Sequence, residues 1–129
     1  MKKVQVSFIA AIGWFIISFF LLTIPGTAFP KEDWLDKIWF DKWVHIGMFS
    51  IMVVLWCLTW RLLKTNATTG KLRQVFITIG LIWLGYGIAM EFVQKYLIPY
   101  RSFDFGDIIA DAAGCAGGLV FSIRRYIKK

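Results

Sequence analysis

The 129-residue chain contains few of the side chains from which common active sites are built. It has one histidine and two cysteines, too few for the clustered nitrogen and sulfur ligands of a typical zinc centre. The sequence also lacks a glycine-rich phosphate loop, a His-Glu-x-x-His motif and a nucleophile elbow. A serine hydrolase is therefore poorly supported. No internal repeat or low-complexity tract divides the chain, which indicates a single domain over residues 1–129.

Long apolar runs dominate what is present. Hydrophobic residues make up 58% of the chain, aromatic residues 18%, and the mean hydropathy is +0.63, which is too apolar for a soluble domain of this size. Four runs approach the roughly 20 residues that a helix needs to cross a bilayer. They cover about 4–24, 43–60, 72–90 and 105–123. The sequence predicts an all-α protein, a bundle of four transmembrane helices.

The segment between the first two runs predicts a short helix of a different kind. We interpret the first run as an uncleaved helix, because it is longer than the roughly 7–15-residue core of a signal peptide. Pro25 and Pro30 end it, since proline cannot continue a helix. From Lys31 to Phe40 the apolar residues share one face, with Trp34 and Trp39 among them. We expect an amphipathic helix lying in the membrane interface.

Charge is distributed unevenly over the ends of the runs. The formal net charge of +7 is spread between apolar runs, so we expect no nucleic-acid partner. One side holds ten basic residues and the other holds five, which by the positive-inside rule puts both termini in the cytoplasm. All eight acidic residues fall on the outer side.

Small residues recur at helical spacing in the fourth run, where Ala110, Gly114 and Gly118 are four residues apart beside Gly117. Such spacing lets helix backbones approach closely in lipid, either within one chain or in a homo-oligomer. Gly13, Gly80, Gly85 and Gly87 in other runs suit the same purpose. The two cysteines, Cys57 and Cys115, lie at different depths, which predicts buried free thiols and no disulfide.

Polar residues gather where the last three runs meet the outer face. Short antiparallel connections bring these ends together, so we expect one outer-leaflet pocket. Asp41 and His45 share a helix face, as do Asp107 and Asp111. The candidate ligand-binding residues are Asp41, Lys42, His45, Glu91, Gln94, Arg101, Asp107 and Asp111.

The balance of charge in this pocket points to a bound cation or to shared protons. Ionisable groups inside a membrane segment are costly and mark functional sites by default. The inner acids outnumber the cations Lys42 and Arg101. Carboxylates with one histidine suit Mg²⁺, Mn²⁺ or Ca²⁺, so a divalent cation is a candidate cofactor. Its candidate ligands are His45, Glu91, Asp107 and Asp111.

The polar residues form an ordered set of motifs: Asp41-Lys42-x-x-His45, Glu91-x-x-Gln94, Pro99-x-Arg101 and Asp107-x-x-x-Asp111-x-x-Gly114. In order and spacing this set resembles the VanZ-like family of membrane proteins, over about residues 41–118. The chain departs from the family pattern at Asp111, where asparagine is expected, and this departure makes the site more negative. The resemblance implies a small multi-pass protein of the bacterial cytoplasmic membrane. It brings no catalytic assignment.

Three functions stay open from the sequence. The resemblance implies a role in the cell envelope, since the founding member is associated with reduced susceptibility to the glycopeptide teicoplanin. The pocket would then bind a membrane lipid, a lipid-linked envelope precursor or a glycopeptide. The second reading is a membrane-interfacial enzyme, a lipid phosphoryl or acyl hydrolase or transferase with His45 or Asp111 as general base. The third is a non-catalytic scaffold braced by the polar residues.

Overall fold

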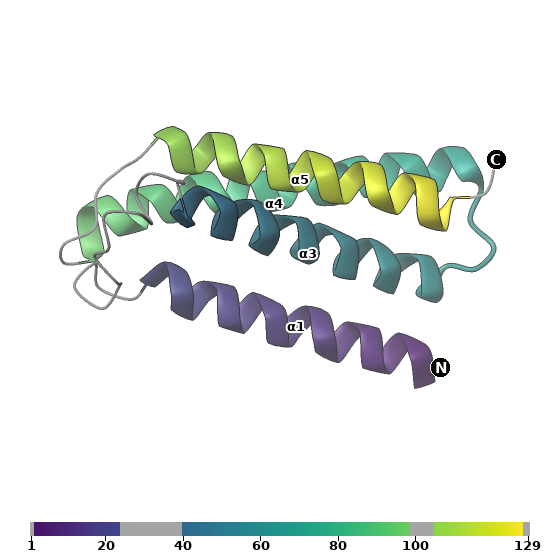
Figure 1. The fold of residues 1–129 in the computed structure, drawn as a ribbon. Helices are drawn as coiled ribbons and strands as arrows, with labels where there is room; N and C mark the ends of the chain where they lie inside the picture. The colour runs from purple at the N-terminus through teal and green to yellow at the C-terminus, as the bar shows by residue number, and fades with distance from the viewer. Residues whose placement is uncertain (1, 24–39, 99–104, 128–129) are drawn as a thin grey trace.

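The computed structural model describes residues 2–23, 40–98 and 105–127, apart from the side chains of Phe40 and Asp41. Every regular element within these residues is a helix (Figure 1), and the elements are α1 (Lys2–Thr23), α3 (Phe40–Leu63), α4 (Thr69–Leu97) and α5 (Phe105–Tyr126). By length and composition, all four are long and apolar enough to cross a membrane. The length and composition of these helices confirm the predictions of an all-helical chain and of a multi-pass membrane protein.

The middle helices extend beyond the apolar runs that predicted them. α3 begins at Phe40 and α4 ends at Leu97, so the polar residues that flank the apolar runs are helical, among them Lys42 and Glu91. The bounds of α4 have local causes. The Thr68 side chain accepts a hydrogen bond from the Lys71 backbone N–H (3.2 Å), which caps the helix start. Ile98 is extended (φ −108°, ψ 122°), as expected for a residue that precedes proline.

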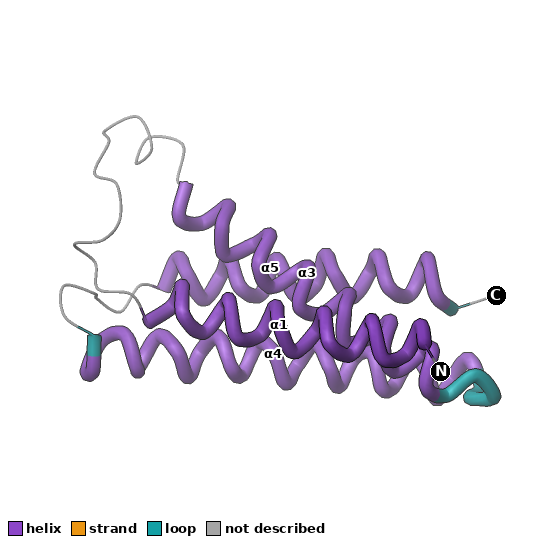
Figure 2. The backbone as a smooth tube through the Cα atoms, turned by 90° about the horizontal axis from the view of Figure 1, so that it is seen from below, coloured by secondary structure: helices purple, strands orange, loops and turns teal. Residues whose placement is uncertain are grey.

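The helices run antiparallel to their chain neighbours. Figure 1 and Figure 2 show the start of α1 and the end of α5 at the same end of the bundle as the connection between α3 and α4. The opposite end is therefore formed by the start of α3, the end of α4 and the start of α5. Residues 31–39 of the predicted interfacial helix lie outside the described residues, and Phe40 belongs to α3.

Helix α3 occupies the centre of the arrangement. It packs against each of the other three helices, whereas the backbones of α1 and α5 do not approach each other closely within the described ranges. Polar side chains join α1 to this centre, because the hydroxyls of Ser7 and Thr59 are 2.6 Å apart and the Trp14 indole N–H donates to the Met48 carbonyl at 2.9 Å. Interhelical hydrogen bonds of this kind help to hold helices together where lipid removes the hydrophobic driving force.

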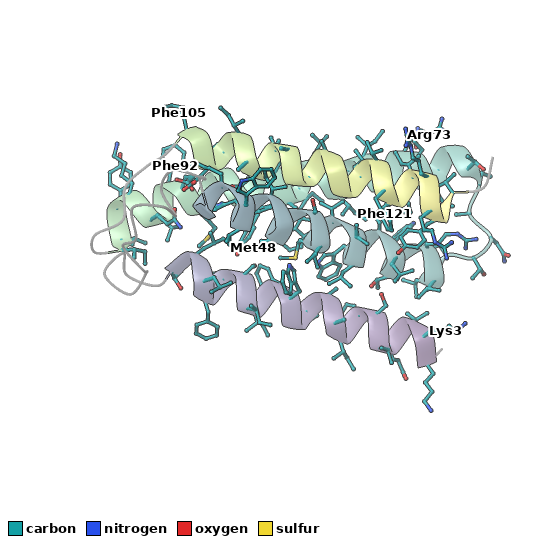
Figure 3. All side chains as sticks on the ribbon, viewed as in Figure 1. Lys3, Met48, Arg73, Phe92, Phe105 and Phe121 are labelled. Carbon is teal, nitrogen blue, oxygen red and sulfur yellow. The ribbon has the colours of Figure 1, made fainter. Side chains whose placement is uncertain are left out.

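Large apolar side chains cover the outside of the bundle. Ile9, Leu81 and Ile109 are each more than 60% exposed, and Figure 3 shows Phe105 projecting away from the start of α5. A soluble monomer rarely exposes so much contiguous apolar surface, whereas lipid solvates it. The thiols of Cys57 and Cys115 are buried and free, as predicted.

Two glycines set the distance between α3 and α5. A Cβ added at Gly114 would lie 2.5 Å from the Ile46 carbonyl oxygen, and one added at Gly118 would lie 2.6 Å from the Ser50 carbonyl oxygen. Both obstacles are backbone atoms, which cannot move without separating the helices. The Ser50 hydroxyl also donates to the Gly114 carbonyl at 2.8 Å. The predicted close packing through the fourth run therefore operates within the chain.

The other glycines that the sequence suggested for packing behave differently. A Cβ at Gly13 or Gly85 would meet nothing within 4 Å, and one at Gly80 or Gly117 would make an ordinary contact at 3.8 or 3.6 Å. The prediction of helix packing was wrong at Gly13 and Gly85, because spacing alone does not reveal which way a glycine faces. Gly80 and Gly117 face a neighbouring helix, but without the close backbone approach found at Gly114 and Gly118. Gly117 is exposed on α5, and a homo-oligomer through this helix stays a prediction.

Alanine at Gly114 or Gly118 should lower the free energy of unfolding by about 1–3 kcal/mol, because overpacking pushes α3 from α5. Alanine at Gly117, the adjacent control, should be neutral or stabilise by up to about 1 kcal/mol through its higher helix propensity. Reversible unfolding in mixed micelles, followed by circular dichroism, measures both. Equal effects at 117 and 118 would contradict the packing described here.

Candidate functional site

Five polar side chains from three helices converge at the end of the bundle opposite the termini. We call this group the polar cluster; it consists of Lys42, His45, Glu91, Asp107 and Asp111. Helical periodicity explains the convergence. Lys42 and His45 are three residues apart on α3, and Asp107 and Asp111 are four apart on α5, so each pair shares one face of its helix. Because α3 and α5 are closely packed neighbours, the two faces meet.

A chain of ionic contacts runs through the cluster from α3 to α5 and back. The Lys42 ammonium donates to Asp107 Oδ1 at 2.8 Å. The other oxygen of this carboxylate, Oδ2, lies 3.7 Å from His45 Nε2. The opposite ring nitrogen, His45 Nδ1, lies 2.7 Å from Asp111 Oδ1. When Asp111 is ionised, Nδ1 carries the proton and donates it to this carboxylate.

Burial increases along the same chain. The side chains of Lys42 and Asp107 are 22% and 11% exposed, that of His45 is 7% exposed, and that of Asp111 is 1% exposed. Glu91 on α4 is equally deep at 1%. The cluster therefore has a more accessible edge at Lys42 and a closed interior at Glu91 and Asp111.

Two residues that sequence reasoning did not assign to the site hold its interior in place. Phe49 stacks parallel to the His45 ring, with centroids 6.5 Å apart and 7° between the planes. Gly87 makes room for Asp111, since a Cβ there would lie 2.6 Å from Asp111 Oδ2. The spacing offered a signal for both. Phe49 follows His45 by four residues and Gly87 precedes Glu91 by four, so each lies on the cluster face of its helix.

The innermost group has the composition of a cation site. Potential ligand atoms of His45, Glu91 and Asp111 all lie within 4.8 Å of one another, and all three residues are buried. Asp107, also a predicted ligand, is not in this group and pairs with Lys42 instead. With one lysine against three carboxylates, the formal charge of the polar cluster is −2 when His45 is neutral.

The remaining predicted site residues divide into two kinds. Gln94 is buried but bonds elsewhere, because its side-chain amide N–H donates to the Leu22 carbonyl at 2.9 Å. It satisfies a carbonyl in the last turn of α1, which has no partner within its own helix, and so ties α4 to α1. Arg101 and the side chain of Asp41 lie outside the described residues.

Replacing Lys42 or Asp107 by its neutral counterpart should lower the free energy of unfolding by different amounts. In chelator-treated protein, Lys42→Gln should lower the free energy of unfolding more than Asp107→Asn, by about 1 kcal/mol, because it leaves a negative cluster without its lysine. Lys95→Gln, at the exposed end of α4, controls for loss of a lysine. Denaturant titration measures all three. Equal or reversed costs would show that the cluster carries no excess negative charge.

Comparison with known proteins shows a similarity along most of the chain. No family model matches it, and no solved structure matches it. The chain is 30% identical over 122 residues to an uncharacterized protein of the fission yeast Schizosaccharomyces pombe. This similarity covers 95% of the chain and 64% of the yeast protein, so the chain spans less than two thirds of that relative. A similarity of this length extends through all four helices, and it leaves the resemblance to the VanZ-like family a prediction.

Proposed function

We propose that this chain is a VanZ-like membrane protein whose polar cluster binds the phosphate-bearing headgroup of a membrane lipid or of a lipid-linked envelope precursor. The observation that carries the proposal is the 2.8 Å ion pair of Lys42 and Asp107 at the accessible edge of an otherwise buried cluster. A lysine in this position offers an ammonium group to phosphate oxygens, which bind such groups through charge-assisted hydrogen bonds. The lysine ammonium carries three donor hydrogens, so it can bind a phosphate oxygen while it keeps its bond to Asp107.

The interior of the cluster supplies the second half of the recognition. Glu91 and Asp111 are buried carboxylates that accept hydrogen bonds from donors, and hydroxyl or amino groups are common in lipid headgroups. A ligand that carries both a phosphate and such donors would place the phosphate at the Lys42 ammonium and the donors at the carboxylates further inside.

The orientation that fits this function has both termini in the cytoplasm and the cluster in the outer leaflet. The excess of lysine and arginine at the end of the bundle that holds the termini supports it. In a bacterial cytoplasmic membrane, the cluster would then face the side on which envelope precursors are used. Binding them would influence envelope composition and, as the VanZ-like resemblance implies, susceptibility to glycopeptides such as teicoplanin.

A second candidate function is a membrane-interfacial enzyme that transfers or hydrolyses a lipid phosphoryl or acyl group. The contact that favours it is the 2.7 Å bond between His45 Nδ1 and Asp111 Oδ1. A carboxylate at Nδ1 orients an imidazole so that Nε2 can act as a general base. In this protein, however, Nε2 faces Asp107 at 3.7 Å, so a substrate hydroxyl or water would have to enter between them.

The headgroup proposal is tested with a matched pair of lipids, dioleoyl phosphatidic acid and dioleoylglycerol, which differ by the phosphate. Native mass spectrometry of delipidated protein should show phosphatidic acid bound in preference to dioleoylglycerol. Lys42→Gln should weaken binding of phosphatidic acid about tenfold, the effect of losing one hydrogen bond to a charged group. Lys42→Arg should retain binding, because the positive charge is kept.

Lys95→Gln is the matched control, since it removes a lysine from the same end of the bundle without touching the cluster. It should bind phosphatidic acid as the unaltered chain does. Undiminished binding by Lys42→Gln, or an equal loss in Lys95→Gln, would mean that the cluster does not recognise the phosphate.

A further inference from the structure

We propose that His45, Glu91 and Asp111 form a binding site for one divalent cation, for which Mn²⁺ is the best-suited ion. The three ligands come from three different helices, α3, α4 and α5, and each is buried to at least 95%. Residues far apart in sequence reach one point only because the helices pack in this way. This inference extends the headgroup proposal to the cluster interior, and it holds whether or not a lipid binds at Lys42.

The distances fit a small divalent cation. Bonds of about 2.1 Å place neighbouring octahedral ligands about 3 Å apart and opposite ligands about 4.2 Å apart. His45 Nδ1 and Asp111 Oδ1 are 2.7 Å apart, close to the neighbouring spacing, and the Glu91 ligand atom lies within 4.8 Å of both residues' ligand atoms. The 4.8 Å limit exceeds the spacing of opposite ligands by about 0.6 Å, so side-chain movements of that size would bring the three atoms into one coordination shell.

The surroundings of His45 match those of a metal-bound imidazole. Histidines that coordinate a metal through one ring nitrogen almost always donate the other N–H to a carboxylate, a carbonyl or water. With Nδ1 on the metal, Nε2 would carry the proton and face Asp107 Oδ2, which at 3.7 Å would have to move closer to accept a hydrogen bond. Lys42 holds that carboxylate by its other oxygen, and Phe49 stacks on the ring. Asp107 thus becomes an orienting partner rather than a ligand, which explains why it stands outside the inner group.

Charge and donor chemistry select the ion. Among the described residues the polar cluster has three carboxylates and one lysine, and a divalent cation would offset this excess of negative charge, which is costly in an apolar bundle. Ca²⁺ takes six to eight oxygen ligands, and Mg²⁺ prefers oxygen and keeps several waters. A set of one imidazole and two carboxylates suits Mn²⁺ better. Three protein ligands leave positions open for water or for a phosphate oxygen.

The test titrates Mn²⁺ into purified full-length protein with an affinity tag that contains no histidine, and follows free Mn²⁺ by electron paramagnetic resonance. The unaltered chain should bind one ion. Asp111→Asn and Glu91→Gln should each lose at least tenfold in affinity, since loss of even an orienting partner costs about 10–100-fold. Cys115→Ser, one turn beyond Asp111 on α5, is the matched control and should bind normally.

A second measurement uses the unaltered protein, so it does not depend on whether a variant folds. His45 is the one histidine of the chain, so protein grown on ¹⁵N-histidine gives the ring signals of this residue alone. Substoichiometric Mn²⁺ should broaden them selectively. No binding up to about 1 mM Mn²⁺, unchanged affinity in both folded carboxylate variants, or unbroadened His45 signals would each overturn the metal site. None of these outcomes bears on phosphatidic acid binding through Lys42.

Discussion

A carboxylate enclosed by apolar helices has lost its hydration, and the protein around Asp111 is arranged to replace it. His45 supplies a hydrogen bond of 2.7 Å to one oxygen, and Gly87 leaves space for the other. Because a buried, unpartnered charge would cost several kcal/mol, these contacts limit where α3 and α4 can lie relative to α5. The positions of Lys42 and Asp107 follow from the same helix faces, one turn nearer the end of the bundle.

The tight contact between α3 and α5 serves the same requirement. Gly114 lies three residues beyond Asp111 and Gly118 seven, both on the face that meets α3, so the glycines bring the two backbones together directly below the cluster. Wider separation would lengthen the His45–Asp111 bond and admit other groups. Packing in the apolar part of the bundle and chemistry at its end are thus properties of one helix pair.

Much of this organisation could be predicted from the sequence, because apolar run length and helical periodicity act locally. They gave the four helices and the shared faces of Asp107 with Asp111 and of Lys42 with His45. What they could not give is the rotation and depth of one helix against another. For this reason the amide of Gln94, expected in the pocket, bonds to Leu22 of α1, and the support from Phe49 and Gly87 was missed. Gly13 and Gly85 were assigned to close packing for the same reason.

The coupling between His45 and Asp111 tests most directly the claim that a buried polar cluster organises the bundle. A double-mutant cycle with His45→Gln, Asp111→Asn and the double variant, measured by reversible unfolding in bilayer-like micelles, gives their interaction free energy. We predict a favourable coupling of at least about 1 kcal/mol, within the range found for residues in one buried network. Additive effects, with a coupling below about 0.3 kcal/mol, would contradict the claim.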